Sequence, residues 1–335
     1  MVTGTRSPIT SEIDFDAEGQ QVGFLRLPHS VHRSAYGWIP IPIAQIKNGD
    51  GPTLFLMSGN HGDEYEGQVT LTKLVQTLEP DAIRGRIILL PMANYPAANA
   101  GLRTSPIDDG NLNRSFPGDP EGSVTQIIAH YIEHVLLEMA DFAIDLHAGG
   151  SSLHYLPTVL FGERKDPAEN ATILKMMRKF GAPYACKFAR SRANVCSSAA
   201  RRQSTALITV EMGGSGTVSM DSLKVAEEGV QRVMASFGFL AAPDVVPAPS
   251  TRILEISSAD CFLYAAEEGL FEPRVELGAM VQAEQVAGVV HTPQTPWKPS
   301  TEVRFKTSGL VICKRVPARV ERGDCLFHLG TDLSI

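Results

Sequence analysis

The sequence predicts an α/β protein: a mixed, largely parallel sheet with helices on both faces, followed by a small C-terminal β-domain. Three observations support this fold class. Short apolar runs rich in branched residues alternate with amphipathic helical patterns, the runs are almost continuously apolar as buried parallel strands are, and helical periodicity fades near the C-terminus. We expect two domains, residues 1–240 and 250–335, joined by the Pro-rich stretch 241–249.

The first elements alternate in type. Residues 53–58 and 86–92 are continuous apolar runs and predict buried strands, and the amphipathic stretch 67–78 between them predicts a helix. Apolar residues at helical spacing over 124–140 predict the next helix, and residues 142–146 predict the next strand. Strands that alternate with helices in this way favour parallel pairing.

The remaining elements continue this pattern and then depart from it. Helical stretches are expected near 168–180 and 220–237, with a strand at 206–210 between them. Beyond the linker, residues 269–286 and 309–325 share a weak repeat in which a Gly-Leu pair leads to a Val and then, five residues later, to another apolar residue. Two such units predict a small pseudo-twofold β-barrel.

Composition excludes several classes of protein. Thirty Lys and Arg against 37 Asp and Glu give a net charge of −7, which exerts no overall attraction on nucleic acid or anionic lipid. No apolar run approaches the roughly 18 to 20 residues of a membrane span, and the N-terminus resembles neither a signal nor a transit peptide. Five widely spaced cysteines argue against a disulfide scaffold. We expect a cytoplasmic protein without nucleic-acid or membrane partners.

Two segments suggest a metal site. His61 and Glu64 lie three residues apart directly after the strand 53–58, and His147 follows the strand 142–146. Imidazole nitrogen and carboxylate oxygen are ligands that zinc takes readily, and catalytic zinc sites use three protein ligands. Asp145 shares a strand face with His147 and can orient it by a hydrogen bond. The alternatives are an acidic first helical turn at residues 61–64 and a buried structural histidine at position 147.

Glu211 adds a fourth polar group at a strand end. It follows the strand 206–210 and precedes two glycines, where a carboxylate can act as a general base on a metal-bound water. Taken alone, it could equally be a capping or solvated residue. Because ligands of open α/β sheets bind at the carboxyl ends of the strands, we expect His61, Glu64, His147 and Glu211 to meet at one edge.

The long loop 94–118 is predicted to bind substrate. It is polar and punctuated by Gly and Pro, and ordered loops of this length are usually functional. Arg103 and Arg114 can each bind a carboxylate through two hydrogen bonds or polarise a carbonyl, and Asn113 can donate a hydrogen bond to the same group.

Four strings in order along the chain resemble one family. GNHGDEYEG, LRTSPIDDGNLNRSFPG, DLHAGG and VEMGGSGT are similar to motifs of the succinylglutamate desuccinylase/aspartoacylase family, relatives of the zinc carboxypeptidases, and the similarity covers nearly the whole chain. Within that family, the sequence looks most similar to the enzymes of ectoine degradation that remove acetate from N-acetyl-2,4-diaminobutyrate. The resemblance implies a zinc-dependent deacylase acting on a small N-acyl amino acid, and it mildly favours a homo-oligomer.

The resemblance also implies roles for individual residues. By this likeness, His61, Glu64 and His147 are ligands of Zn²⁺ and Glu211 is the general base. Arg103 polarises the scissile carbonyl, Asn113 and Arg114 bind the α-carboxylate, and Asp145 matches a family aspartate beside the third ligand. The C-terminal segment resembles the β-domain that family members pack beside the site.

The substrate stays open between several alternatives. The basic segment 187–202 lies in a stretch without Asp or Glu, which suits a second carboxylate, as in N-acetylaspartate or a succinyl amide, better than the ammonium of diaminobutyrate. If these bases face solvent, as charged runs usually do and as we favour, diaminobutyrate remains the first choice. A zinc carboxypeptidase is a further alternative. A biotinyl- or lipoyl-like carrier is the least favoured, since Lys298 and Lys306 lie in no attachment motif.

Overall fold

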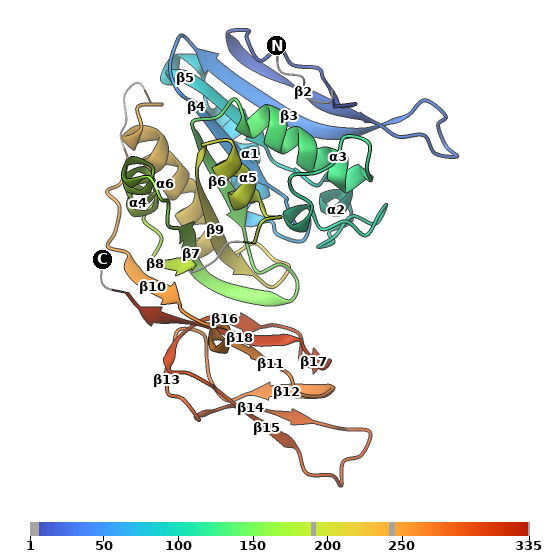
Figure 1. Cartoon of the computed structure of the whole chain (residues 1–335), viewed down its shortest axis with the longest axis vertical. Helices are drawn as coiled ribbons and strands as arrows, with labels where there is room; N and C mark the ends of the chain where they lie inside the picture. The colour runs from blue at the N-terminus through green and yellow to red at the C-terminus, as the bar shows by residue number, and fades with distance from the viewer. Residues whose placement is uncertain (1–6, 189–191, 241–244, 334–335) are drawn as a thin grey trace.

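One large mixed sheet runs through the molecule. The computed structural model describes residues 7–188, 192–240 and 245–333. Within these residues a 14-stranded sheet has the order β1-β2-β3-β5-β4-β6-β9-β7-β8-β10-β18-β16-β13, with β11 paired to β18. The expected α/β fold with a mixed sheet is confirmed, but the sheet is not largely parallel as predicted, because most of its neighbouring strands pair antiparallel. Figure 1 shows the helices gathered around the upper part of that sheet.

Parallel pairing is confined to the middle of the sheet. Neighbours pair in parallel across β5-β4-β6-β9, then β7 runs antiparallel to β9 and parallel to β8, which is parallel to β10. The bounds of these strands are β4 (Thr53–Ser58), β5 (Gly85–Leu90), β6 (Phe142–His147), β7 (Leu153–Gly162), β8 (Tyr184–Phe188) and β9 (Ala206–Gly214). The carboxyl ends of β4, β6 and β9 therefore lie at one edge, as expected.

Helices cover both faces of this central part. One face packs against α1 (Glu66–Thr77), α4 (Pro167–Phe180) and α6 (Met220–Ser236). The other packs against α3 (Val124–Tyr131), the π-helical turn η3 (Ile132–Leu137) and α5 (Cys196–Arg202). Alternate residues of β4 point into the hydrophobic cores on the two faces of the sheet. Phe55 and Met57 belong to one core, and Leu54 and Leu56 belong to the other. The helix predicted over 124–140 thus begins as an α-helix and continues as a π-helical turn.

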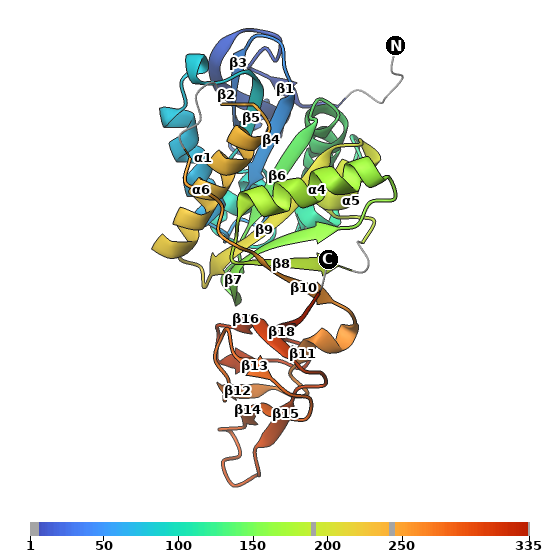
Figure 2. The ribbon, with the colours of Figure 1, turned by 90° about the vertical axis from the view of Figure 1, so that its left-hand side faces the viewer.

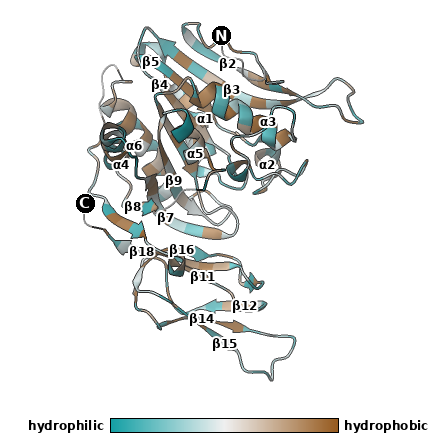
Figure 3. Cartoon of the chain, in the orientation of Figure 1, coloured by the Kyte–Doolittle hydropathy of each residue, from teal (hydrophilic) through white to brown (hydrophobic). Residues whose placement is uncertain are grey.

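Two long N-terminal strands extend the sheet and were not predicted. β2 (Gly19–Pro28) pairs with β3 (Trp38–Asn48) and with the short β1 (Thr10–Ser11). Figure 3 shows both long strands as alternating hydrophilic and hydrophobic stretches. Pro40 and Pro42 interrupt the β-propensity of β3, but they leave Ile41 and its alternate neighbours free to enter the core.

The C-terminal segment is almost entirely β-structure. β10 (Arg252–Ile256), β11 (Phe262–Tyr264), β13 (Met280–Val281), β16 (Gly309–Arg315) and β18 (Cys325–Asp332) join the large sheet. A second sheet has the order β15-β14-β12-β17, formed by β12 (Gly269–Pro273), β14 (Val286–His291), β15 (Thr301–Arg304) and β17 (Arg319–Val320). Figure 2 shows this segment below the helical layers, joined to them through β10, β16 and β18.

The weak sequence repeat corresponds to a structural repeat. The succession β12-β13-β14 matches β16-β17-β18, and in each unit the two longer strands pair antiparallel. The short strand of each unit pairs with the other unit, since β13 pairs with β16 and β17 with β12. This reciprocal pairing of the two short strands is the pseudo-twofold relation that the repeat predicts. The division into domains at residues 240 and 250 stays a prediction.

The remaining elements are short. They are α2 (Tyr95–Ala100) and the 3₁₀ turns η1 (Pro80–Ala82), η2 (Leu112–Arg114) and η4 (Ala259–Cys261). Of the predicted linker, residues 241–244 lie outside the described residues, and 245–249 have no regular structure. No helix in the described part of the chain is long and apolar enough to span a membrane.

Candidate metal centre and active site

Two histidines and one glutamate converge in the interior. The Nδ1 atoms of His61 and His147 lie 2.7 Å and 2.8 Å from the two carboxylate oxygens of Glu64. The three side chains offer ligand atoms within 4.8 Å of one another, and no other such group of His, Cys, Asp or Glu occurs among the described residues. All three residues are buried. The structure therefore brings together the three residues expected to bind a metal.

The sheet accounts for this convergence. β4 and β6 are parallel neighbours, with Ser58 opposite Leu146, so the segments that follow them emerge at the same edge. Gly59 makes the sharp turn between Ser58 and the 61–64 segment with a φ of +65°. A side chain there would place its Cβ 2.9 Å from the Cα of Met92. Glycine is thus required on both counts.

A second layer of polar groups holds the ligands. Asp145 Oδ2 lies 2.9 Å from His147 Nε2 and accepts a hydrogen bond from Asn60 Nδ2 at 3.3 Å. The backbone N–H of Ala148 donates to Glu64 Oε2 at 3.1 Å. Because Asp145 occupies Nε2 of His147, the Nδ1 atom is the one directed at Glu64. Such a carboxylate–histidine pair is typical of metal-binding imidazoles.

The charge states and the donor set fit a divalent cation. Burial alone would raise the pKa of Glu64, but the neighbouring His61 and His147 hold that pKa well below its ordinary value, so the carboxylate is ionised. His61 Nε2 is buried and has no hydrogen-bond partner among the described residues. Two imidazoles with one carboxylate form the donor set of catalytic zinc sites, which leave a position for water or substrate.

Glu211 lies beside this cluster. It is opposite His147 in the parallel register of β6 and β9, and its Oε2 is buried without a hydrogen-bond partner among the described residues. Burial raises the pKa of Glu211 to about 8, since His147 offsets the effect only in part. A cation held nearby would lower this pKa toward neutrality, the range that suits a general base at physiological pH.

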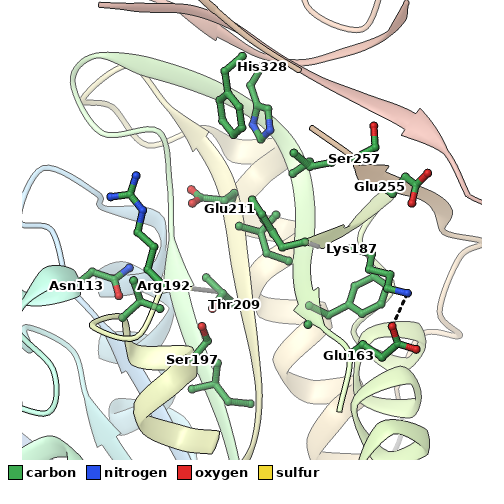
Figure 4. Close-up of a pocket in the computed structure, with 18 of the residues that line it drawn as sticks. Asn113, Glu163, Lys187, Arg192, Ser197, Thr209, Glu211, Glu255, Ser257 and His328 are labelled. Atoms are coloured by element: carbon green, nitrogen blue, oxygen red, sulfur yellow. Dashed lines mark ion pairs between the residues drawn. The ribbon is translucent and has the colours of Figure 1, made fainter. Parts of the chain in front are cut away.

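Glu211 also lines a large pocket of about 1270 Å³. Asn113 and Arg114, which the sequence suggests as substrate-binding residues, line the same pocket, and Figure 4 shows Glu211 between Asn113 and the C-terminal segment. The three candidate metal ligands are not lining residues. Arg103 is not one either, but its Nη1 lies 3.6 Å from Glu64 Oε1, so it borders the metal cluster directly. Glu211 therefore lies beside the metal cluster and also lines the pocket.

Contacts with the rest of the protein hold the loop residues Asn113 and Arg114 in place. Asn113 Oδ1 accepts a hydrogen bond from the backbone N–H of Cys196 at 2.9 Å, which leaves the Nδ2 group as the donor available to a ligand. Burial lowers the pKa of Arg114, helped by the positive charges of Arg192 and Arg103. The guanidinium remains charged far above neutral pH. A ligand carboxylate near Asn113 and Arg114 would therefore meet donors and positive charge.

The basic segment 187–202 divides between pocket and structure. Lys187, Arg192 and Arg201 line the pocket, and Lys187 pairs with Glu163 at 2.7 Å. Arg202 instead pairs with the buried Glu133 through two hydrogen bonds of 2.6 Å and 2.7 Å. Residues 189–191 lie outside the described residues. Three of the four bases named here therefore line the pocket, and the fourth makes a structural ion pair, whereas the sequence favours bases that face solvent.

Sequence reasoning missed one group of pocket residues. These are aromatic side chains from β7, β8, β11 and β18, namely Tyr155, Phe188, Phe262, Tyr264 and His328. They lie together only because β18 and β16 pair with strands far away in the sequence. No local motif marks these residues. Along their short strands they alternate with other residues in the same way as ordinary core residues do.

Comparison with known proteins agrees with this site. Residues 50–237 match the family described as the succinylglutamate desuccinylase/aspartoacylase catalytic domain. The chain is 40% identical over 321 residues to an N-alpha-acetyl-L-2,4-diaminobutyric acid deacetylase of Halomonas elongata, covering 96% of this chain and 94% of that protein.

Solved structures show the same fold. A product-bound structure of the ectoine utilization protein EutE (DoeB) from Ruegeria pomeroyi superposes with a TM-score of 0.94 at 39% identity, covering 98% of this chain and 100% of that one. A succinylglutamate desuccinylase/aspartoacylase from Rhodobacter sphaeroides gives a TM-score of 0.92 at 35% identity with the same coverage. The likeness therefore includes the C-terminal β-structure as well as the sheet that carries the candidate site.

Proposed function

Because the chain belongs to the succinylglutamate desuccinylase/aspartoacylase family, we propose that it is a zinc-dependent amidohydrolase that converts N-acetyl-L-2,4-diaminobutyrate to acetate and the free amino acid. Desuccinylase, aspartoacylase and deacetylase all name hydrolysis of an N-acyl bond, and the chain is an enzyme of this kind. The observation that carries the proposal is the convergence of His61, Glu64 and His147 beside Glu211 at the pocket wall. The 40% identity to a diaminobutyrate deacetylase over 96% of the chain supports the substrate.

His61, Glu64 and His147 would hold the Zn²⁺. When bound, the metal supplies a Lewis acid and lowers the pKa of a bound water toward roughly 7. Asp145 engages Nε2 of His147, so Nδ1 is the nitrogen that would be available to bind the metal. This set of residues supports zinc among the divalent ions through its imidazole and carboxylate donors.

The other residues handle protons and charge. The carboxylate of Glu211 takes a proton from the attacking water and gives it to the leaving amine nitrogen, a contribution of typically 10²- to 10⁴-fold. Arg103 donates to the oxygen of the former carbonyl as negative charge develops there. Asn113 and Arg114 bind the α-carboxylate and so fix the position of the scissile amide.

A dicarboxylic N-acyl amino acid is the second candidate substrate. Lys187, Arg192 and Arg201 line the pocket, and positive charge there suits an additional carboxylate, as in N-acetylaspartate or N-succinylglutamate. From the sequence, we also propose that the protein forms a homo-oligomer and is located in the cytoplasm.

Amine release from a small panel tests the proposal. The panel contains N-acetyl-2,4-diaminobutyrate, N-acetylaspartate, N-succinylglutamate and a dipeptide, each with and without a chelator. We expect chelator-sensitive release from the diaminobutyrate compound, and a Glu211→Gln variant that retains zinc by metal analysis but loses about 10²- to 10⁴-fold in turnover.

Other outcomes are equally informative. Release from a dicarboxylate alone would establish the second candidate, and release from the dipeptide alone would indicate a carboxypeptidase. A Glu211→Gln enzyme with full activity would contradict the assigned proton transfer, and zinc binding without release from any compound would contradict the substrate class.

A further inference from the structure

Pairing across four strands places a row of side chains on one wall of the pocket. Phe262 in β11 is opposite His328 in β18, His328 is opposite Cys313 in β16, and Cys313 is opposite Tyr155 in β7. Directly opposed residues point to the same face of a sheet. The pocket is lined by Phe262, His328 and Tyr155, and also by Phe188 of β8. We call Tyr155, Phe188, Phe262 and His328 the aromatic wall.

The rings of the aromatic wall form a contiguous surface. The rings of Phe262 and His328 are stacked, with centroids 4.1 Å apart and planes inclined by 13°. Tyr155 meets His328 edge-on at 6.1 Å, and Phe188 lies 6.4 Å from the same imidazole. His328 is therefore the centre of the wall, and Figure 4 shows it directed into the pocket above Glu211.

His328 has an unused hydrogen-bonding atom. The residue is 2% exposed, its Nδ1 lies 3.4 Å from the hydroxyl of Tyr155, and its Nε2 has no partner among the described residues. Burial lowers the pKa of His328 to about 3, so the imidazole is neutral at physiological pH. Buried polar atoms are almost always paired, and an unpaired one facing a pocket suggests that a ligand completes it.

Positive charge also lines the pocket. Its cationic lining residues are Arg114, Arg164, Lys187, Arg192 and Arg201. Glu163 is engaged by Lys187 at 2.7 Å. A cationic group of a ligand would be repelled by these side chains and attracted by the faces of aromatic rings, which bind ammonium groups in the same way as they bind Lys and Arg.

We propose that the aromatic wall recognises the side-chain ammonium of the substrate: the ring faces bind it by cation–π attraction, and Nε2 of His328 accepts a hydrogen bond from it. The inference rests on the proposed function and extends it by naming the residues that select a cationic side chain. With the α-carboxylate held at Arg114, the positive charge in the pocket serves one end of the substrate and the aromatic wall serves the other. A basic pocket is then compatible with an ammonium on the substrate.

A comparison of two isosteric substrates tests this role. Nα-acetyl-L-2,4-diaminobutyrate ends in an ammonium where Nα-acetyl-L-norvaline ends in a methyl group. The ratio of their kcat/KM values is measured for the wild type, Phe262→Leu and His328→Phe, the second of which keeps an aromatic ring and removes the nitrogen. We expect the wild type to prefer the ammonium compound, and each variant to lose about tenfold of that preference.

Two control variants isolate the effect. Phe305→Leu alters a buried ring of the C-terminal core that does not line the pocket, and it should leave the ratio unchanged. Glu255→Gln removes a carboxylate that does line the pocket and is the chief rival for binding an ammonium. Loss of the preference in Glu255→Gln, with the preference intact in Phe262→Leu and His328→Phe, would overturn the inference.

A measurement on the wild type keeps the inference testable if a variant does not fold. The product diaminobutyrate should inhibit more strongly than norvaline, and equal inhibition by the two would overturn the aromatic wall as the recognition element. Wild type that cleaves neither compound would overturn the proposed function together with this inference. Cleavage of both with an unaltered ratio in every variant would overturn the inference alone.

Discussion

The carboxylate of Asp145 shows how one residue outside the proposed metal ligands can set the chemistry of another. It holds Nε2 of His147 at 2.9 Å and is itself held by Asn60. Asp141 stands at the other end of the same segment and accepts a hydrogen bond from the backbone of Thr53 at 2.8 Å, away from the metal cluster. The two aspartates provide a matched pair for mutation.

Asp145→Asn should weaken metal binding by about 10- to 100-fold, because an amide orients and polarises the imidazole less well than a carboxylate. Asp141→Asn should leave the affinity unchanged. Titration of the metal-free protein with Zn²⁺ against a competing chelator measures both constants. Equal affinities in Asp145→Asn and the wild type would contradict the positioning role.

His328 makes stability depend on pH. Its folded-state pKa of about 3 lies below the ordinary value for histidine, so the unfolded chain takes up a proton as the pH falls below about 6.5 while the folded chain does not until about pH 3. The free energy of unfolding therefore falls across that window. Between pH 7 and pH 4 this residue should account for up to about 3 kcal/mol of the loss.

Urea unfolding at pH 7 and pH 4 measures the effect. His328→Phe should lose less stability between these pH values than the wild type, because the group that titrates is gone. His134→Phe, at an exposed position, is the control and should follow the wild type. Equal losses in His328→Phe and the wild type would show that the imidazole does not titrate differently in the two states.

Individual site residues differ in how far sequence could predict them. His61 and Glu64 follow a strand in the chain, so local pattern and the rule for parallel sheets placed them at one edge, together with Glu211, which lies within β9 rather than after it as predicted. His328 has no such mark, because its neighbours in space, Phe262 and Tyr155, reach it through antiparallel pairing over long sequence separations. Register of that kind is decided by packing between segments rather than by local pattern.

At the level of elements, α5 and the π-helical turn η3 are joined by a charged pair. Glu133 in η3 is 1% exposed and accepts two hydrogen bonds from Arg202 of α5. Periodicity over 124–140 correctly indicated a helix but not the π-helical turn within it. The strands β2 and β3 were not predicted, because prolines obscured their alternation of polar and apolar residues. The pairing of the two strands nevertheless keeps this alternation.

Arg202→Ala should destabilise the fold by about 3 kcal/mol, because it leaves the carboxylate of Glu133 buried and unpaired. The adjacent Arg201→Ala removes an exposed arginine that has no such partner and should change the free energy of unfolding by less than about 0.5 kcal/mol. Urea denaturation of both variants makes the comparison. Similar losses in the two would contradict a structural role for the Glu133–Arg202 pair.

For the whole molecule, the main point is that the C-terminal strands complete the sheet of the catalytic part. β10 pairs with β8, and β16 pairs with β7. The composition of the C-terminal segment correctly predicted β-structure, and the faint repeat predicted its pseudo-twofold pairing. Continuity with the main sheet could not be predicted, since nothing local in β10 or β16 identifies its partner strand.

A chain ending at residue 240 should therefore be defective beyond the loss of its β-rich end. It would expose the edge of β8, a template for pairing with other chains, and it would lack Phe262 and His328 from the pocket. We expect aggregation in size-exclusion chromatography and no measurable acetate release. A monomeric fragment with full activity would contradict this dependence on the C-terminal strands.

The placement of the aromatic wall has a consequence for how such enzymes diversify. The groups that we propose to break the amide lie in or directly after β4, β6 and β9, whereas two residues of the wall come from β11 and β18, near the end of the chain. Mutations in those late strands can change which side chain is accepted while the bond-breaking groups stay intact. A lineage could therefore acquire new substrates by small steps, without passing through an inactive ancestor.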